Sequence, residues 1–175
     1  METRKPITHV VAGLLIAGIV IVLSMVMMLL AKSTAGKPGS GWITYAIIIG
    51  ALIFFIMQYG KANNFQPSFG ELFSYGFKAT AMYTVVFIGF LVLFSFLFPD
   101  FKTNAIETAR TQMETQKGVT EEQMEKGMQV MEKYFWPIAI GGTTLMFVII
   151  GAIGSLIGAG VTKKQPQNPF SQLPQ

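Results

Sequence analysis

The sequence contains no cysteine, one histidine and few charged residues. Without cysteine there is no disulfide framework, no thiolate nucleophile and no thiolate metal site. Charged residues make up 13% of the 175 residues, about half the share of roughly 25% that soluble domains carry. Hydrophobic residues make up 51%. This balance excludes a soluble enzyme, a disordered protein and a nucleic-acid-binding domain.

Charged residues are absent from four long apolar stretches. These are residues 7–31, 42–59, 79–98 and 135–161. A helix that crosses a bilayer needs about 20 mostly apolar residues, and in lipid its backbone groups must hydrogen bond within the segment. We therefore predict an all-α integral membrane protein with four transmembrane helices.

The first apolar stretch follows Arg4 and Lys5, as the apolar region of a signal peptide would. That region is normally about 7–15 residues long and ends at a small-residue cleavage site. Here the stretch is longer and ends in Leu-Leu-Ala-Lys. We expect an uncleaved span.

The first two connections differ in kind. Residues 32–41 form a short Gly/Ser/Pro-rich turn, which predicts antiparallel neighbouring spans. In the second connection, Ser68 and Glu71 have the spacing of a capping box. A helix is therefore expected to begin near Phe69, before the third apolar stretch.

The third connection holds most of the charge and predicts two helical segments within residues 103–134. Gly118 is suited to the end of the first segment, and Thr120 with Gln123 forms a second capping box. Glu122 and Lys126 have the spacing of a weak surface ion pair. We expect a helical hairpin packed against the ends of the bundle.

Methionine dominates one face of the second of these segments. Met124, Met128 and Met131 share that face with Phe135, at spacings of four, three and four residues. Methionine adapts to partners of varied shape, so this face predicts either a docking surface or contact with the protein's own span ends and lipid headgroups.

The distribution of cations predicts the orientation in the membrane. The two termini and the second connection together carry six Lys and Arg against two acids. The third connection carries five against seven acids, and the first connection adds Lys32 and Lys37. By the positive-inside rule, both termini are expected in the cytoplasm and the hairpin in the periplasm. Trp42 and Trp136 then both lie at the outer interface.

Small residues crowd the second half of the last span. Gly154 and Gly158 form a GxxxG pair, and Gly151 with Ser155 forms a second small pair. Such pairs let a second helix approach closely. The first span, with its own small residues, is the expected neighbour, ahead of a homo-oligomer or another membrane subunit.

Uncharged polar residues within the spans allow an alternative function. Gln58, Thr143 and Thr144 could line a path for a small substrate, which would suit a small transporter or channel subunit. Such groups more often hydrogen bond between or within helices.

No motif for an enzyme or a cofactor is present. His9 has no second histidine as a partner, and Glu121, Glu122 and Glu125 fit a solvated helix face better than a cation site. We predict neither catalytic nor metal-binding residues.

The chain divides into a membrane domain of residues 1–164 and a Pro-rich tail of residues 165–175. The tail composition favours an extended or disordered segment.

Several segments carry a resemblance to a known family. These are the Phe- and Gly-rich residues 69–77, Phe-Pro-Asp-Phe at 98–101, residues 118–125 and 131–135, and the final Lys163-Lys164. Together they resemble a family of small four-span inner-membrane proteins of Bacteroidota, known as a domain of unknown function. The resemblance implies a bacterial cytoplasmic membrane and no particular activity.

Abundant packing surfaces and the absence of charge within the spans favour a non-enzymatic protein. The function expected from the sequence is that of an accessory or assembly subunit of a larger inner-membrane complex, in contact with lipid and with other membrane subunits.

Overall fold

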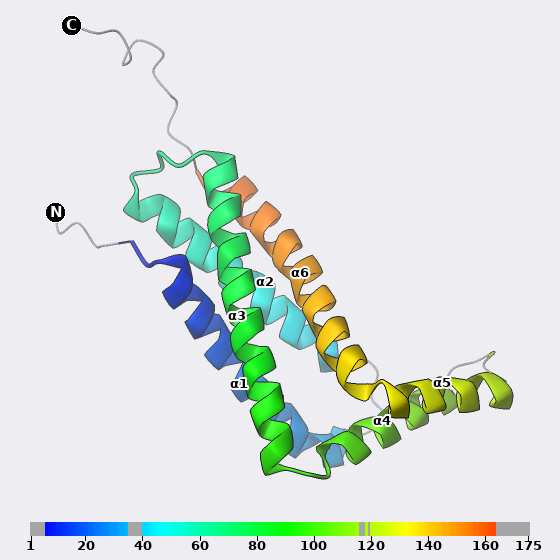
Figure 1. Ribbon diagram of the computed structural model, residues 1–175. Coiled ribbons are helices and arrows are strands. Elements are labelled where there is room, and N and C mark those ends of the chain that lie inside the picture. Colours follow the sequence, from blue (N-terminus) through cyan, green and yellow to red (C-terminus); the bar gives the residue numbers. More distant parts are fainter. Residues whose placement is uncertain (1–5, 35–39, 116–117, 119, 164–175) are drawn as a thin grey trace, which may run out of the picture.

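A computed structural model describes residues 6–34, 40–115, 118 and 120–163. Within these residues the chain forms helices and no strand (Figure 1). The helices are α1 (His9–Thr34), α2 (Ser40–Ala62), α3 (Phe69–Leu97), α4 (Phe101–Thr115), α5 (Glu121–Lys133) and α6 (Phe135–Val161). The predicted tail, residues 165–175, and the terminal cations Arg4, Lys5 and Lys164 lie outside the described residues.

Four of the helices, α1, α2, α3 and α6, are long and apolar enough to cross a membrane. The four predicted spans are thus confirmed as helices. As predicted, α3 begins at Phe69, where the Ser68 Oγ accepts from the Glu71 N–H at 3.3 Å. The Ser68 N–H in turn donates to Glu71 Oε2 at 2.7 Å. With 29 residues, α3 is about 43 Å long, which exceeds the hydrocarbon thickness of about 30 Å.

The core lies where α3 meets α1, α2 and α6. It contains branched aliphatic side chains such as Ile16 and Leu52, together with the fully buried Tyr83. The Tyr83 hydroxyl donates to the Phe147 carbonyl at 3.2 Å, which joins α3 to α6. Apolar side chains such as Val85 and Leu93 point outward, as expected for a bundle surrounded by lipid.

The two ends of the bundle have different elements. The start of α1 and the end of α6 lie at one end, near the connection between α2 and α3 (Figure 1). The start of α2, with Trp42, and the start of α6, with Trp136, lie at the other end. The two tryptophans therefore share one end, as the predicted antiparallel topology requires.

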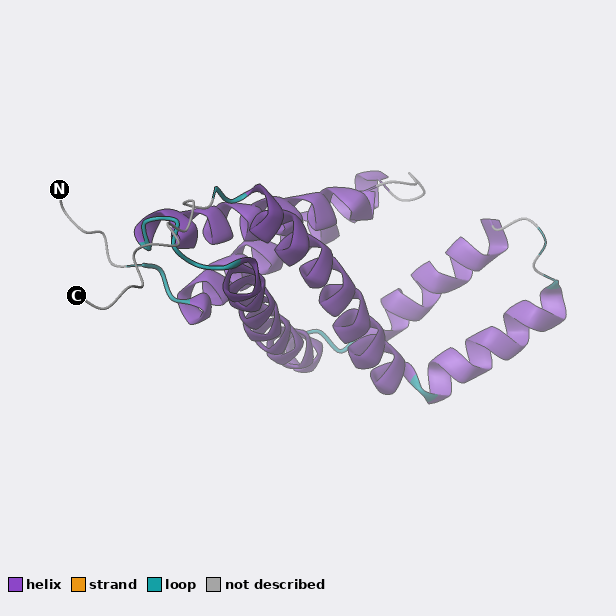
Figure 2. Cartoon of the chain, turned by 90° about the horizontal axis from the view of Figure 1, so that it is seen from above, coloured by secondary structure: helices purple, strands orange, loops and turns teal. Residues whose placement is uncertain are grey.

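Helices α4 and α5 form the predicted hairpin, which we name the arm. It leaves the tryptophan end of the bundle and extends sideways beyond it (Figures 1 and 2). The prediction that the hairpin packs against the ends of the bundle was therefore wrong, because the hairpin extends sideways beyond them. The sequence pattern is amphipathic in either arrangement, and it does not specify which surface the helices contact.

Candidate functional site

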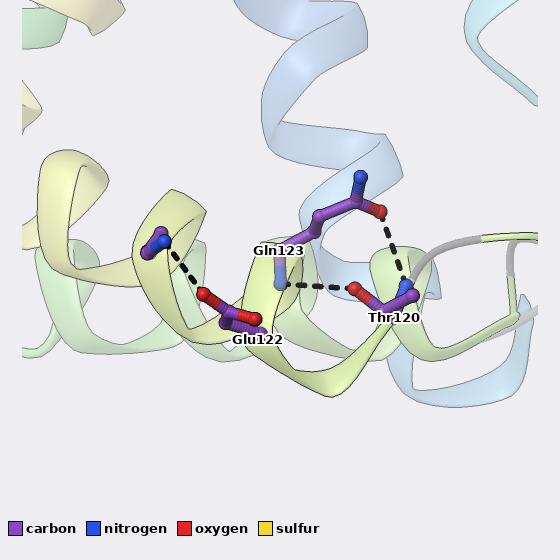
Figure 3. A network of polar contacts seen from close by, with 4 residues as sticks. Thr120, Glu122 and Gln123 are labelled. Carbon is purple, nitrogen blue, oxygen red and sulfur yellow. Dashed lines mark hydrogen bonds and ion pairs between the residues drawn. The ribbon is translucent and has the colours of Figure 1, made fainter.

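The arm is built from two local signals that the sequence predicted. Gly118, between its helices, has a φ of +96°, a left-handed conformation that glycine adopts without steric cost. The side chain of Thr120 then caps α5 by accepting from the Gln123 N–H at 3.3 Å. The Gln123 Oε1 accepts from the Thr120 N–H at 3.2 Å (Figure 3). These bonds satisfy N–H groups that would otherwise lack partners at the helix start.

The arm has no core of its own. None of the described residues of α4 and α5 is buried. Its ion pairs, Glu122–Lys126 at 2.7 Å and Arg110–Glu114 at 3.4 Å, join exposed side chains. The first of these is the pair that the sequence predicted, and a dashed line from Glu122 marks it in Figure 3. Exposed pairs of this kind contribute at most about 1 kcal/mol.

A groove of about 940 Å³ runs between α4 and α5. Met124 and Met128 line it from α5, and Ile106 lines it from α4. Among the described residues that line the groove, one is basic, Arg110, and five are glutamates: Glu107, Glu114, Glu121, Glu125 and Glu132. The groove therefore combines apolar and acidic lining residues. Met124 and Met128 of the predicted methionine face line it, whereas Met131 does not.

An aromatic cluster attaches the arm to the bundle. The ring of Phe101, at the start of α4, lies 5.7 Å from that of Phe94 and 6.3 Å from that of the buried Phe135. The Lys102 ammonium lies 5.9 Å from the Phe135 ring centroid. The arm is thus fixed at its base, while its groove extends away from the bundle.

The small residues of α6 pack against α2 and α3. A Cβ added to Gly154 would lie 2.9 Å from Leu52, one added to Gly158 would lie 2.6 Å from Ile56, and Gly151 faces Thr80. Ser155 is fully buried against Gly76. The expectation that the first span is the neighbour was wrong, because α1 packs on α3 through Gly13.

The polar residues proposed to line a path lie apart. Gln58 is close to Gly60, which faces Thr162 at the far end of α6. Thr143 and Thr144 lie near the start of α6, on the order of 25 Å away along the bundle at 1.5 Å per residue. The Thr144 hydroxyl donates to the Ile140 carbonyl at 2.7 Å. The structure does not bring these three residues together.

His9 and the three glutamates of the arm, to which no catalytic or metal-binding role was assigned, also lie apart. His9 lies at the start of α1, whereas Glu121, Glu122 and Glu125 lie in the arm at the opposite end. In the part of the chain that the structure describes, no three His, Asp or Glu side chains are placed to hold a metal ion.

One candidate site was not predicted from the sequence. It is a cavity of about 400 Å³ around His9, Tyr59 and Tyr75. Its residues come from three segments far apart in the sequence, so no motif could reveal it. The only signal was the group of polar residues at the start of α3.

Comparison with known proteins supplies a family. Searches of curated proteins and of solved structures give no match. A family described as "Protein of unknown function (DUF4199)" matches residues 12–164. This range is close to the part of the chain that carries the resemblance to a family of unknown function. Since the match covers most of the chain, the protein belongs to the DUF4199 family.

Proposed function

We propose that the protein is a non-enzymatic accessory or assembly subunit of a larger complex in a bacterial cytoplasmic membrane, and that the arm binds the partner. The observation that carries the proposal is that two helices of 15 and 13 residues bury none of their described side chains. Isolated helices of that length are marginal in water. A partner in the groove would supply the missing contacts.

The lining of the groove indicates the chemistry of that partner. Its methionines offer a soft apolar surface, and its glutamates give the lining a net negative charge among the described residues. A helix with one apolar face and flanking Lys or Arg residues matches both features. We propose such a segment of another membrane subunit as the occupant, ahead of a second copy of this chain.

The test is native mass spectrometry of the tagged protein after gentle extraction at its native expression level. We expect a stoichiometric companion subunit. Met128→Glu places a charge in the groove and should remove the companion. Val130→Glu is the matched control, because Val130 lies two residues away, is 52% exposed and does not line the groove.

Two results would contradict this proposal. One is a chain that remains alone at native abundance. The other is a companion that is lost equally with Met128→Glu and Val130→Glu. A homo-oligomer that depends on Met128 would keep the role of the arm but replace the proposed partner with a second copy.

We also propose that both termini are cytoplasmic and the arm periplasmic, on the basis of the excess of cations on the terminal side. The chain has no cysteine, so a single introduced cysteine is the only thiol that a reagent can label. In spheroplasts, a membrane-impermeant maleimide should label Val130→Cys, which is exposed in the arm and does not line the groove, and not Gln66→Cys, between α2 and α3. The reverse pattern would invert the topology.

A further inference from the structure

The cavity at the end of the bundle opposite the arm, which has both apolar and polar lining residues, has the features of a binding site. It lies between residues 6–8, the end of α2 and the first turns of α3. Its volume of about 400 Å³ is within the usual range for small-molecule sites, roughly 300–1,000 Å³.

Tyr75 organises the cavity. Its side chain is almost completely buried, and its hydroxyl donates to the Ile7 carbonyl at 2.9 Å. Its ring stacks on that of Tyr59, with centroids 4.3 Å apart, and meets the His9 ring edge-on at 6.5 Å. These contacts tie α1, α2 and α3 together, so the cavity is formed before any ligand enters.

One face of α3 presents opposite charges to the cavity. Glu71, Ser74 and Lys78 all line it and are spaced three and four residues apart, which places them on one side of the helix. The row is about 10 Å long at 1.5 Å per residue. Among the described residues, neither Glu71 nor Lys78 takes part in an ion pair. Along this row, a ligand therefore meets a carboxylate acceptor, a hydroxyl group and a cation, in that order.

The capping role of Glu71 leaves it able to bind a ligand. Both of its bonds to Ser68, from the backbone N–H and from the hydroxyl, end on Oε2. The second carboxylate oxygen, Oε1, can accept from a cationic group in the cavity. Since Glu71 is held in place by the cap, little side-chain entropy is lost on binding.

The helices that form the cavity also carry exposed apolar side chains. Phe69 and Phe77 on α3, and Val10 and Val11 on α1, are exposed apolar side chains on the helices that form it. These surfaces can contact acyl chains while the polar row contacts a headgroup.

We propose that the cavity binds the headgroup of a phospholipid that carries both a phosphate and a primary ammonium, such as phosphatidylethanolamine. Lys78 binds the phosphate, with the Ser74 hydroxyl as a second donor, and Glu71 accepts from the ammonium. A primary ammonium has N–H donors that a quaternary ammonium lacks. A purely anionic headgroup would leave Glu71 facing like charge.

The test uses the full chain, purified in detergent and titrated with lipids of identical acyl chains in native mass spectrometry. Phosphatidylethanolamine should bind about tenfold more tightly than phosphatidylcholine or phosphatidylglycerol, as expected for one additional hydrogen bond to a charged group. Glu71→Gln retains the capping box, because glutamine also serves at that position. It should abolish the preference over phosphatidylcholine.

Lys78→Gln should weaken the binding of all three lipids by about tenfold through the loss of the phosphate contact. Lys61→Gln is the matched control, because Lys61 is an exposed lysine at the end of α2 and does not line the cavity. It should change nothing.

Three results would overturn the proposal: equal binding of the three lipids by the unmodified protein, equal losses with Lys78→Gln and Lys61→Gln, or no effect of Glu71→Gln. The phosphate and ammonium groups could belong to a lipid headgroup or to a soluble aminophosphate. Free O-phosphoethanolamine distinguishes the two. It should compete weakly with the lipid. Competition at the same concentration as the lipid would make the ligand a soluble aminophosphate and overturn the lipid assignment.

Discussion

The bundle and the arm are stabilised in opposite ways. In the bundle, small residues of α6 let α2 and α3 approach closely, and Tyr83 bonds across to α6 in the buried core. In the arm, caps and exposed ion pairs are present, but no described side chain is buried. The bundle is therefore stabilised by contacts within this chain, whereas the arm has its local helix signals without a core among its described residues.

The largest effect is expected from a methyl group added inside the bundle. Gly151→Ala places a Cβ against Thr80, where something must shift, and overpacking of this kind costs about 1–3 kcal/mol. Gly142→Ala is the control, because open space surrounds Gly142 in the same helix. Denaturant unfolding in micelles should show a lower free energy of unfolding for Gly151→Ala and no loss for Gly142→Ala. Equal stability of the two variants would contradict the close packing of α6.

A medium effect is expected when the N-cap side chain is removed from one helix of the arm and from one helix of the bundle. Thr120→Ala and Ser68→Ala should each cost about 1 kcal/mol of local stability. In the arm this should raise amide exchange at Glu122 and Gln123 about fivefold, because no packing supports α5. In α3, exchange beyond the first turn should stay unchanged, since the bundle holds the helix. If the rise in amide exchange extends equally far along α5 and α3, the distinction between the arm and the bundle is contradicted.

A smaller effect is expected from Tyr83→Phe, which removes the hydroxyl bond to the Phe147 carbonyl. Hydrogen bonds between membrane helices contribute on average about 0.6 kcal/mol and at most about 1.7 kcal/mol. Denaturant unfolding in micelles should show that the free energy of unfolding falls by an amount within that range. Tyr134→Phe, at an exposed position, should have no effect, and a matching loss there would argue against the assigned role of Tyr83.

Shortening the arm should have almost no effect on the bundle. When residues 104–131 are replaced by a short Gly-Ser linker, the aromatic base at Phe101 and Phe135 remains. The free energy of unfolding of the bundle should change by less than about 0.5 kcal/mol, as for changes away from a core. A large loss of stability would show that the arm supports the bundle.

The sequence predicted the features that depend on local chemistry. The spans follow from apolar length, the starts of α3 and α5 from the capping residues Ser68 and Thr120, and the break between α4 and α5 from Gly118. Each signal lies within a few residues of the feature that it determines.

What the sequence could not predict depends on contacts between distant segments. The small residues of α1 suggested that it packs on the stripe at Gly154 and Gly158, but the stripe packs against the large side chains of Leu52 and Ile56 in α2, so the pattern did not identify the neighbour. The amphipathic pattern of the arm is the same whether the hairpin covers its own bundle or another protein. The cavity at Tyr75 depends on Ile7 and Tyr59, which only the fold brings together.

The most direct test of this account compares hydrogen exchange of the arm in two settings. One is native membrane vesicles, and the other is the purified chain reconstituted in lipid extracted from the same membranes. We expect amides of α4 and α5 to be protected in native vesicles and to exchange rapidly in the purified chain, while those of α3 and α6 are protected in both. Equal exchange of the arm in the two settings would contradict the claim that a partner completes it.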